Sequence, residues 1–141
     1  MKLITITGCL GFIGSYVTRA CLSRGWKVYG IDKMTYAANP DLLKEFDNNP
    51  NFTFQRADIA KIECDYIINL AAESHVGNSI INSDDFISSN IVGTKNILDI
   101  IRHKPENTDS RPHLIHFSTD EVYGDIVENS HKETDLLHPS N

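Results

Sequence analysis

The sequence has 141 residues, of which 40% are hydrophobic and 23% charged, a size and composition ordinary for one soluble globular domain. Its formal net charge of −6 argues against nucleic acid or an anionic membrane as a partner. The three scattered cysteines argue against a disulfide framework, and the apolar runs are too short for a signal peptide or for a membrane span of roughly 18 residues, so we expect a cytoplasmic protein.

The first predicted elements are a strand and a helix joined by a glycine-rich segment. Residues 2–7 are β-branched and apolar almost throughout, which predicts a strand buried on both faces. A helix is expected to run from the glycine-rich segment to about Arg24, because Gly25 supplies a C-terminal stop. Four positions share one face of this helix: Ile13, Val17, Ala20 and Arg24.

The next stretch is expected to return to the sheet and then to form a short helix. Residues 26–32 predict a second strand. Asn39 before Pro40 is typical of a helix cap followed by a first helical position, so a short helix is expected to end at about Phe46. Residues 51–55 predict a third strand.

The remaining part of the chain repeats the alternation. Residues 66–72 predict a fourth strand, and residues 84–102 predict a helix with acids at its start and bases at its end, which suits the helix dipole. The residues spaced four and three apart, as on one face of a helix, are Ile87, Ile91, Thr94, Leu98 and Ile101. After a polar loop at 104–112, residues 113–117 predict a fifth strand. Strands separated by helical crossovers predict an α/β fold with a doubly wound parallel sheet.

The turn after the first strand carries the spacing Gly-x-x-Gly-x-x-Gly at Gly8, Gly11 and Gly14. A pyrophosphate can approach backbone N–H groups closely only where side chains are absent, and a helix N-terminus attracts its charge. Asp32 ends the second strand, 18 residues after Gly14, near the place expected for a carboxylate that binds an adenosine ribose. A plain tight turn would use the same glycines, but the flanking strand and helix favour dinucleotide binding. NAD is expected over NADP, because an acid repels a 2′-phosphate.

Residues 118–124, STDEVYG, place a hydroxyl and two carboxylates where the fifth strand is expected to end. Acids at a strand end can simply be solvated, and that interpretation stays open. In a regular strand Asp120 would face away from Thr119 and Glu121. A catalytic interpretation therefore requires the strand to break up by about Thr119, which the turn at Tyr123-Gly124 allows.

Five segments, in this order and spacing, resemble the dTDP-glucose 4,6-dehydratase family of extended short-chain dehydrogenase/reductases: TGCLGFIGS, DKMTYAAN, LAAESHV, NIVGTKN and STDEVYGD. The resemblance runs from residue 3 to the last residue. It implies that residues 1–141 are the N-terminal portion of a Rossmann-type NAD-binding domain, with about five strands and without the C-terminal substrate domain. Cys9-Leu10 replaces the family's common Gly-Ala. Gly77-Asn78 replaces its usual Asp-Arg, which weakens any assignment of substrate contacts in the loop that follows LAAESHV.

The resemblance implies NAD as cofactor and assigns residues to it. Phe12 and Ile13 would meet the pyrophosphate, while Asp58 and Ile59 would flank the adenine. Ser89 stands where the family usually has Thr, and its hydroxyl keeps the contact plausible. The implied cofactor-binding residues are Gly8, Gly11, Phe12, Ile13, Gly14, Asp32, Lys33, Met34, Thr35, Asp58, Ile59, Leu70, Ala71, Ala72, Glu73, Ser74 and Ser89.

The resemblance also implies the chemistry. A 4,6-dehydratase oxidises the sugar C4 hydroxyl by hydride transfer to NAD, removes the acidified C5 proton and expels the C6 hydroxyl before the hydride returns. By resemblance, Thr119 holds the C4 oxygen, Asp120 is the acid and Glu121 is the base. Ser74, His75 and Thr119 would contact the substrate. Sister epimerases only move the hydride, so the carboxyl pair favours a dehydratase.

The family's Tyr-x-x-x-Lys pair would follow where this sequence stops, so the 141-residue chain alone is expected to be inactive. Tyr29 and Lys33 have the same spacing but straddle the end of the second strand, and we interpret that match as chance. Three functions stay open. They are the N-terminal part of a 4,6-dehydratase in deoxysugar biosynthesis, part of a related nucleotide-sugar epimerase or other sugar dehydratase, and a non-catalytic NAD-binding module.

Two further expectations concern partners. A homodimer is expected for the full-length form, and without a partner the apolar stripe of the helix at 84–102 would be exposed. No metal site is predicted, because His113 and His116 lie three apart in a strand and therefore on opposite faces.

Overall fold

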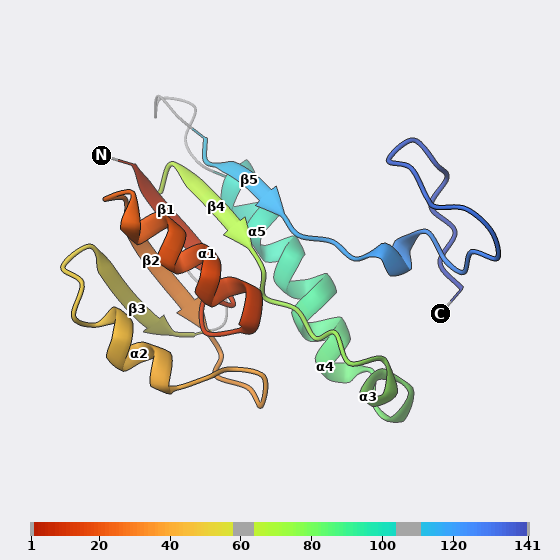
Figure 1. The fold of residues 1–141 in the computed structure, drawn as a ribbon, viewed down its shortest axis with the longest axis horizontal. Helices are drawn as coiled ribbons and strands as arrows, with labels where there is room; N and C mark the ends of the chain where they lie inside the picture. Colours follow the sequence, from red (N-terminus) through yellow and green to blue (C-terminus); the bar gives the residue numbers. More distant parts are fainter. Residues whose placement is uncertain (1, 58–63, 104–110, 141) are drawn as a thin grey trace.

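β1 (Leu3–Thr7) lies at the centre of a five-stranded parallel sheet in the computed structural model, which describes residues 2–57, 64–103 and 111–140 (Figure 1). The other strands are β2 (Lys27–Asp32), β3 (Phe52–Arg56), β4 (Tyr66–Asn69) and β5 (His113–His116). The order β3-β2-β1-β4-β5 means that the chain builds outward to β3 and then returns to the far side of β1. This confirms the predicted doubly wound, Rossmann-type sheet. Its order reverses between β1 and β4, where such folds bind ligands at the carboxyl ends of the strands.

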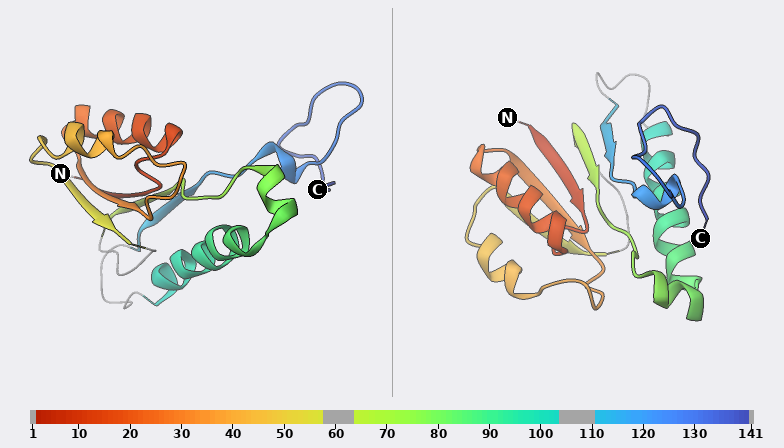
Figure 2. Two further views of the ribbon diagram at one scale, coloured as in Figure 1. Left: turned by 90° about the horizontal axis from the view of Figure 1, so that it is seen from below. Right: turned by 45° about the vertical axis from the view of Figure 1, so that its right-hand side comes forward.

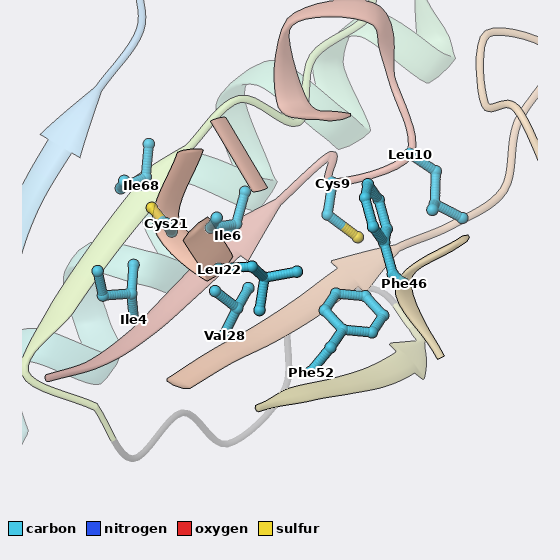
Figure 3. Close-up of a cluster of buried hydrophobic side chains, with 10 residues drawn as sticks. All are labelled: Ile4, Ile6, Cys9, Leu10, Cys21, Leu22, Val28, Phe46, Phe52 and Ile68. Carbon is cyan, nitrogen blue, oxygen red and sulfur yellow. The ribbon is translucent and has the colours of Figure 1, made fainter. Parts of the chain in front are cut away.

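Helices cover both faces of the sheet, as Figure 2 shows. α1 (Phe12–Ser23) and α2 (Asp41–Phe46) lie on one face, and α5 (Gly93–Arg102) lies on the other. The core under α1 and α2 is drawn in Figure 3 and consists of Ile4, Ile6, Cys9, Leu10, Cys21, Leu22, Val28, Phe46, Phe52 and Ile68. The core on the α5 side consists of Ile31, Cys64, Ile67 and Ile97. The sheet is therefore buried on both faces, as the apolar pattern of β1 predicts.

The sheet side of α1 differs from the grouping made from the sequence. Its buried residues are Gly14, Ser15, Thr18, Cys21 and Leu22. Ile13 and Ala20 are exposed instead, and Val17 is half-buried. Close approach explains the difference, because a Cβ on Gly14 would lie 1.9 Å from the Gly8 carbonyl oxygen. Small side chains are therefore selected where α1 leaves the sheet, and apolarity alone does not identify them.

α2 begins at Asp41, one residue later than predicted. The Asn39 side chain still acts at its start, since its Oδ1 accepts a hydrogen bond from the Asp41 N–H at 3.0 Å. α2 is tied to α1 by Arg19, whose Nε and Nη2 donate to the Glu45 carboxylate at 2.5 and 2.7 Å. Both side chains are more than a third exposed, so this pair orients the two helices more than it stabilises them.

The predicted helix at 84–102 is present but not uniform. It consists of α4 (Asp84–Phe86), the π-helical segment η1 (Ile87–Val92) and α5. The π-helical turn was not predicted from the sequence, and neither was α3 (Val76–Ile81). β4 also stops at Asn69 rather than at residue 72. Within the described ranges, no helix has the length and apolar character needed to cross a membrane.

The apolar residues of this helix divide between the sheet and solvent. Ile97 is fully buried against the sheet, and Ile101 is partly buried beside it. Ile87, Ile91 and Leu98 are 47%, 64% and 51% exposed. The expected exposed stripe is therefore present at these three positions but not at Ile101.

Candidate functional site

The turn between β1 and α1 is built around its three glycines. Gly8 adopts φ +68°, and its N–H donates to the Ile31 carbonyl at 2.8 Å. A Cβ on Gly14 would lie 1.9 Å from the Gly8 carbonyl oxygen, and one on Gly8 would lie 2.9 Å from the Ala71 nitrogen. Both positions need glycine for reasons of space. α1 starts at Phe12 without a side-chain capping bond, so its first N–H groups are available to an anion.

Asp32 ties this turn to the end of β2. Its carboxylate is buried, with Oδ2 accepting a hydrogen bond from the Leu10 N–H at 3.0 Å and Oδ1 accepting one from the Met34 N–H at 2.7 Å. Met34 takes φ 61°, which is uncommon for a side chain of this kind, and the backbone bends sharply after the strand. Each carboxylate oxygen has a second lone pair. Asp32 can therefore shape the turn and still accept a hydrogen bond from a ligand hydroxyl.

The first hollow at this edge lies between the glycine turn, the end of β2 and the loop after β4. The Lys33 Nζ reaches within 3.5 Å of the Ser89 Oγ across it. The Tyr29 hydroxyl instead donates to the Gln55 side chain, so the two residues with Tyr-x-x-x-Lys spacing make contacts in different places. The lining residues are Thr7, Gly8, Gly11, Ile31, Asp32, Lys33, Thr35, Ala37, Ala38, Ala57, Leu70, Ala71, Ala72, Glu73 and Ser89.

A polar chain links the carboxyl ends of β1, β4 and β5. Thr7 Oγ1 donates to Asn69 Oδ1 at 2.5 Å, and Asn69 Nδ2 lies 2.9 Å from His116 Nδ1. Because the amide nitrogen is a donor, His116 accepts through Nδ1 and carries its proton on Nε2. The Thr7 oxygen also accepts hydrogen bonds from the Leu70 and Ala71 N–H groups at 3.2 Å each. Three neighbouring strands and the start of the loop after β4 are therefore held in register beside the site.

A second, larger groove of about 810 Å³ runs from the glycine turn to the segment after β5. Its lining combines motifs that are far apart in the sequence. The lining residues are Gly8, Gly11, Phe12, Ile13, Gly14, Ala37, Leu70, Ala71, Ala72, Glu73, Ser74, Val76, Ser79, Phe86, Asn90, Thr94, His116, Phe117, Ser118, Thr119, Glu121, Val122 and Pro139. The glycine motif and the STDEVYG motif thus meet in one groove.

The chain leaves strand geometry before the two acids. β5 ends at His116, and Asp120–Val122 forms a single 3₁₀ turn. Thr119 Oγ1 accepts a hydrogen bond from the Glu121 N–H and donates to Asp120 Oδ1, both at 3.3 Å. The expectation that the strand breaks up by about Thr119 is confirmed. Thr119 and Glu121 line the groove, whereas Asp120 is exposed and is not among its described lining residues.

Most of the residues assigned to the cofactor from the sequence lie at these two hollows. Met34 differs, because its side chain packs on the core under α1 and its N–H binds Asp32. His75 precedes α3 and is exposed, outside both linings as the structure describes them. Asp58 and Ile59 lie outside the described residues. The assigned residues that line a hollow are Gly8, Gly11, Phe12, Ile13, Gly14, Asp32, Lys33, Thr35, Leu70, Ala71, Ala72, Glu73, Ser74 and Ser89.

Asn90 is a site residue that the sequence did not assign. Its Oδ1 accepts a hydrogen bond from the Glu73 N–H and its Nδ2 donates to the Glu73 carbonyl, both at 2.9 Å. The available signal was its place beside Ser89 in the segment NIVGTKN. Phe86, Thr94 and His116 also line the larger groove without having been assigned.

Cys9 sits inside the glycine turn and is fully buried. Its burial, and secondly the nearby charge of Asp32, raise the pKa of the thiol to about 12. The neutral thiol packs beside Gly30, where a Cβ would come within 2.8 Å of the sulfur. Cys9 therefore behaves as a small apolar side chain. In the part of the chain that the structure describes, no group of three or more His, Cys, Asp or Glu side chains could hold a metal ion.

Comparison with protein families and curated sequences gives consistent results. The family model described as GDP-mannose 4,6 dehydratase matches residues 5–141. A dTDP-glucose 4,6-dehydratase of Haemophilus influenzae is 40% identical over an alignment that is 159 positions long and covers 99% of this chain and 46% of the relative. The chain therefore spans less than half the length of such relatives.

Solved structures give the same picture. A dTDP-glucose 4,6-dehydratase from Streptomyces venezuelae, solved with NAD bound, is similar at a TM-score of 0.84 and 33% identity, over 97% of this chain and 45% of that chain. A UDP-glucuronic acid 4-epimerase from Bacillus cereus, solved in complex with NAD, is similar at 0.83 and 28% identity, over 97% and 46%.

Proposed function

Because the chain belongs to the GDP-mannose 4,6 dehydratase family, we propose that it is the NAD-binding part of a nucleotide-sugar 4,6-dehydratase. The proposed substrate is dTDP-glucose and the product dTDP-4-keto-6-deoxyglucose, an intermediate for deoxysugars. The observation that carries this proposal is the groove that joins the glycine turn to Thr119 and Glu121. The choice of sugar nucleotide is supported by the relative that is 40% identical.

The residues present fit a dinucleotide. Gly8 and Gly14 allow neighbouring backbone segments of the turn to approach closely, because an added Cβ on either would collide with them, and the N-terminus of α1 offers N–H groups to a pyrophosphate. Asp32 and Thr35 line the hollow where an adenosine ribose would lie. NAD, when bound, supplies a hydride acceptor and donor. Asp32 would face the 2′-phosphate of NADP, so NAD is the preferred form.

The chain's own residues would handle the sugar and its protons. Thr119 would hold the C4 oxygen through its hydroxyl, and Glu121 would take the C5 proton once a ketone at C4 has acidified it. Asp120 would give a proton to the departing C6 hydroxyl. Asp120 is exposed beside the groove, so this role requires its side chain to turn inward when a sugar binds. Ser74 lines the groove and, with His75, would contact the substrate.

A nucleotide-sugar 4-epimerase is the second candidate, and the similarity to the epimerase of Bacillus cereus favours it. An epimerase moves a hydride at C4 and does not need a carboxyl pair. Asp120-Glu121 therefore favours the dehydratase. A non-catalytic NAD-binding module is the third candidate.

We also propose that residues 1–141 alone do not turn over a sugar nucleotide. The Tyr29 hydroxyl is bound to Gln55, away from the groove, and is not placed to take a C4 hydroxyl proton. We propose a homodimer for a full-length protein containing this chain, which would cover the exposed side chains of Ile87, Ile91 and Leu98 and which sedimentation of that protein would detect.

The decisive experiment incubates a full-length protein containing this chain with dTDP-glucose and NAD, and identifies the product by NMR. A 4-keto-6-deoxy sugar is expected, and Glu121→Gln should slow its formation by roughly 10²–10⁴-fold. Glu128→Gln, at another exposed acid of the same segment, is the matched control and should retain activity. A C4 epimer as product would identify the epimerase instead. NAD binding without turnover of any sugar nucleotide would identify the module.

A further inference from the structure

The helix after α3 changes its winding where it passes the site. In η1 the hydrogen bonds run from i to i+5, an arrangement that is rare and often found at functional sites. Ser89 and Asn90 lie in the middle of η1. Ser89 lines the first hollow, whereas Asn90 lines the larger groove together with Phe86 and Thr94. The wider turn thus presents neighbouring residues to two different hollows.

Asn90 makes a two-point contact with the loop after β4. The Glu73 N–H donates to Asn90 Oδ1, and Asn90 Nδ2 donates to the Glu73 carbonyl, each at 2.9 Å. Both residues are half-buried. The N–H and the carbonyl of Glu73 belong to the two consecutive peptide groups on either side of its Cα, so neither group can rotate without losing one of these bonds.

Glu73, held in this way, belongs to a loop that lines both hollows. Residues 70–73 line both hollows, so this loop divides them. At its start the loop is fixed by the hydrogen bonds that the Leu70 and Ala71 N–H groups donate to Thr7 Oγ1. It also approaches Gly8 so closely that an added Cβ there would lie 2.9 Å from the Ala71 nitrogen. At its far end the contact is the one with Asn90. Because residues 70–73 line both hollows, a shift of the loop between these two points would change the shape of both.

We propose that Asn90 is a positioning residue for the dinucleotide, holding the loop at 70–74 clear of the cofactor's path beyond its adenosine phosphate. The π-helical turn brings Asn90 to the loop. This inference rests on the proposed function for the identity of the ligand. Because Asp32, Lys33 and Thr35 line the adenosine side, loss of Asn90 should weaken NAD selectively over AMP.

Calorimetric titration of the full 141-residue chain with NAD and with AMP tests this selectivity. Asn90→Ala should weaken NAD by about tenfold, as expected for loss of about 1.4 kcal/mol of binding free energy, and change AMP by less than about twofold. Asn96→Ala, in α5 of the same helix and outside both described linings, is the matched control and should change neither. Equal weakening of both ligands, or unchanged NAD affinity, would overturn the proposal.

Amide hydrogen exchange without any ligand gives a second readout. The Glu73 N–H should exchange faster in Asn90→Ala than in the unmodified chain, and its exchange rate should be unchanged in Asn96→Ala. If Asn90→Ala fails to fold, Asn90→Asp keeps the size and the acceptor but sets a carboxylate oxygen against the Glu73 carbonyl, and should show the same selective loss of NAD. NAD binding with unchanged Glu73 exchange would overturn this inference alone. Faster exchange in a chain that binds neither NAD nor AMP would overturn the proposed function and the role of Asn90 with it.

Discussion

The glycine turn and the segment after β5 line the same groove but are held in place very differently. The turn is fixed by contacts between distant parts of the sequence, such as Asp32 to Leu10 and Gly8 against Ala71. The segment after β5 runs away from the sheet in Figure 1, and the hydrogen bonds of Thr119 described above stay within two residues. Changes in the turn should therefore act on folding and on cofactor binding together. Changes at the two acids should act on chemistry alone.

The largest effect is expected from Gly14→Ala. Its Cβ would lie 1.9 Å from the Gly8 carbonyl oxygen, so the turn must move, and the free energy of unfolding should fall by about 3 kcal/mol. Urea denaturation would measure this. Gly25→Ala is the matched control, because Gly25 has φ +70° with no atom within 4 Å of an added Cβ, and only the backbone cost of about 1–2 kcal/mol should appear. Equal losses in the two variants would show that crowding in the turn is unimportant.

Asp32→Ala should follow in size. It leaves the buried Leu10 N–H without its acceptor, and the free energy of unfolding should fall by about 2 kcal/mol. The same change should relax the preference for NAD over NADP in parallel titrations. Asp32→Asn retains one acceptor oxygen, so its free energy of unfolding should lie between those of the unmodified chain and Asp32→Ala. Equal affinity of the unmodified chain for NAD and NADP would contradict the charge argument.

The free energy of unfolding should fall at alkaline pH because the Cys9 thiol is buried. Its thiol has a pKa of about 12 in the folded chain against an ordinary value of 9.0, so both states keep the proton below pH 9, and above it only the unfolded state releases it. The unmodified chain should therefore lose about 1 kcal/mol more stability than Cys9→Ala between roughly pH 8 and 10. Parallel losses in the two proteins would mean that the thiol titrates normally.

The smallest effect is expected at the two acids. Asp120→Asn and Glu121→Gln should each change the free energy of unfolding by less than about 0.5 kcal/mol, because both side chains are exposed. NAD affinity should also be unchanged. A loss from Glu121→Gln as large as that from Asp32→Ala would remove the distinction between the two regions.

The elements that were predictable are those whose sequence pattern has one cause. β1 and β2 are apolar runs buried on both faces, and the glycine spacing between β1 and α1 follows from the approach of two backbones. The buried face of α1 was not predictable, because Ser15 and Thr18 are selected there for size rather than apolarity. α3 has no buried residue and thus left no apolar period to read.

The site divides in the same way. Roles for Asp32 and Glu121 could be proposed from motifs, because each motif lies within a few consecutive positions. The role of Asn90 could not, since it depends on a contact with Glu73, 17 residues away, and on a π-helical turn that has no simple sequence pattern. The link from Asn69 to His116 joins two strands and is likewise visible only once they are paired.

The three buried cysteines make the chain a convenient scaffold for site-specific labelling. Cys9, Cys21 and Cys64 are all buried, and burial raises the pKa of the Cys21 thiol as well as that of Cys9. A maleimide dye reacts with accessible thiolates, and these residues offer few. A single cysteine placed at Val127, which is 97% exposed, would therefore carry the label by itself. Its fluorescence would report directly on how the segment after β5 responds when a sugar nucleotide arrives.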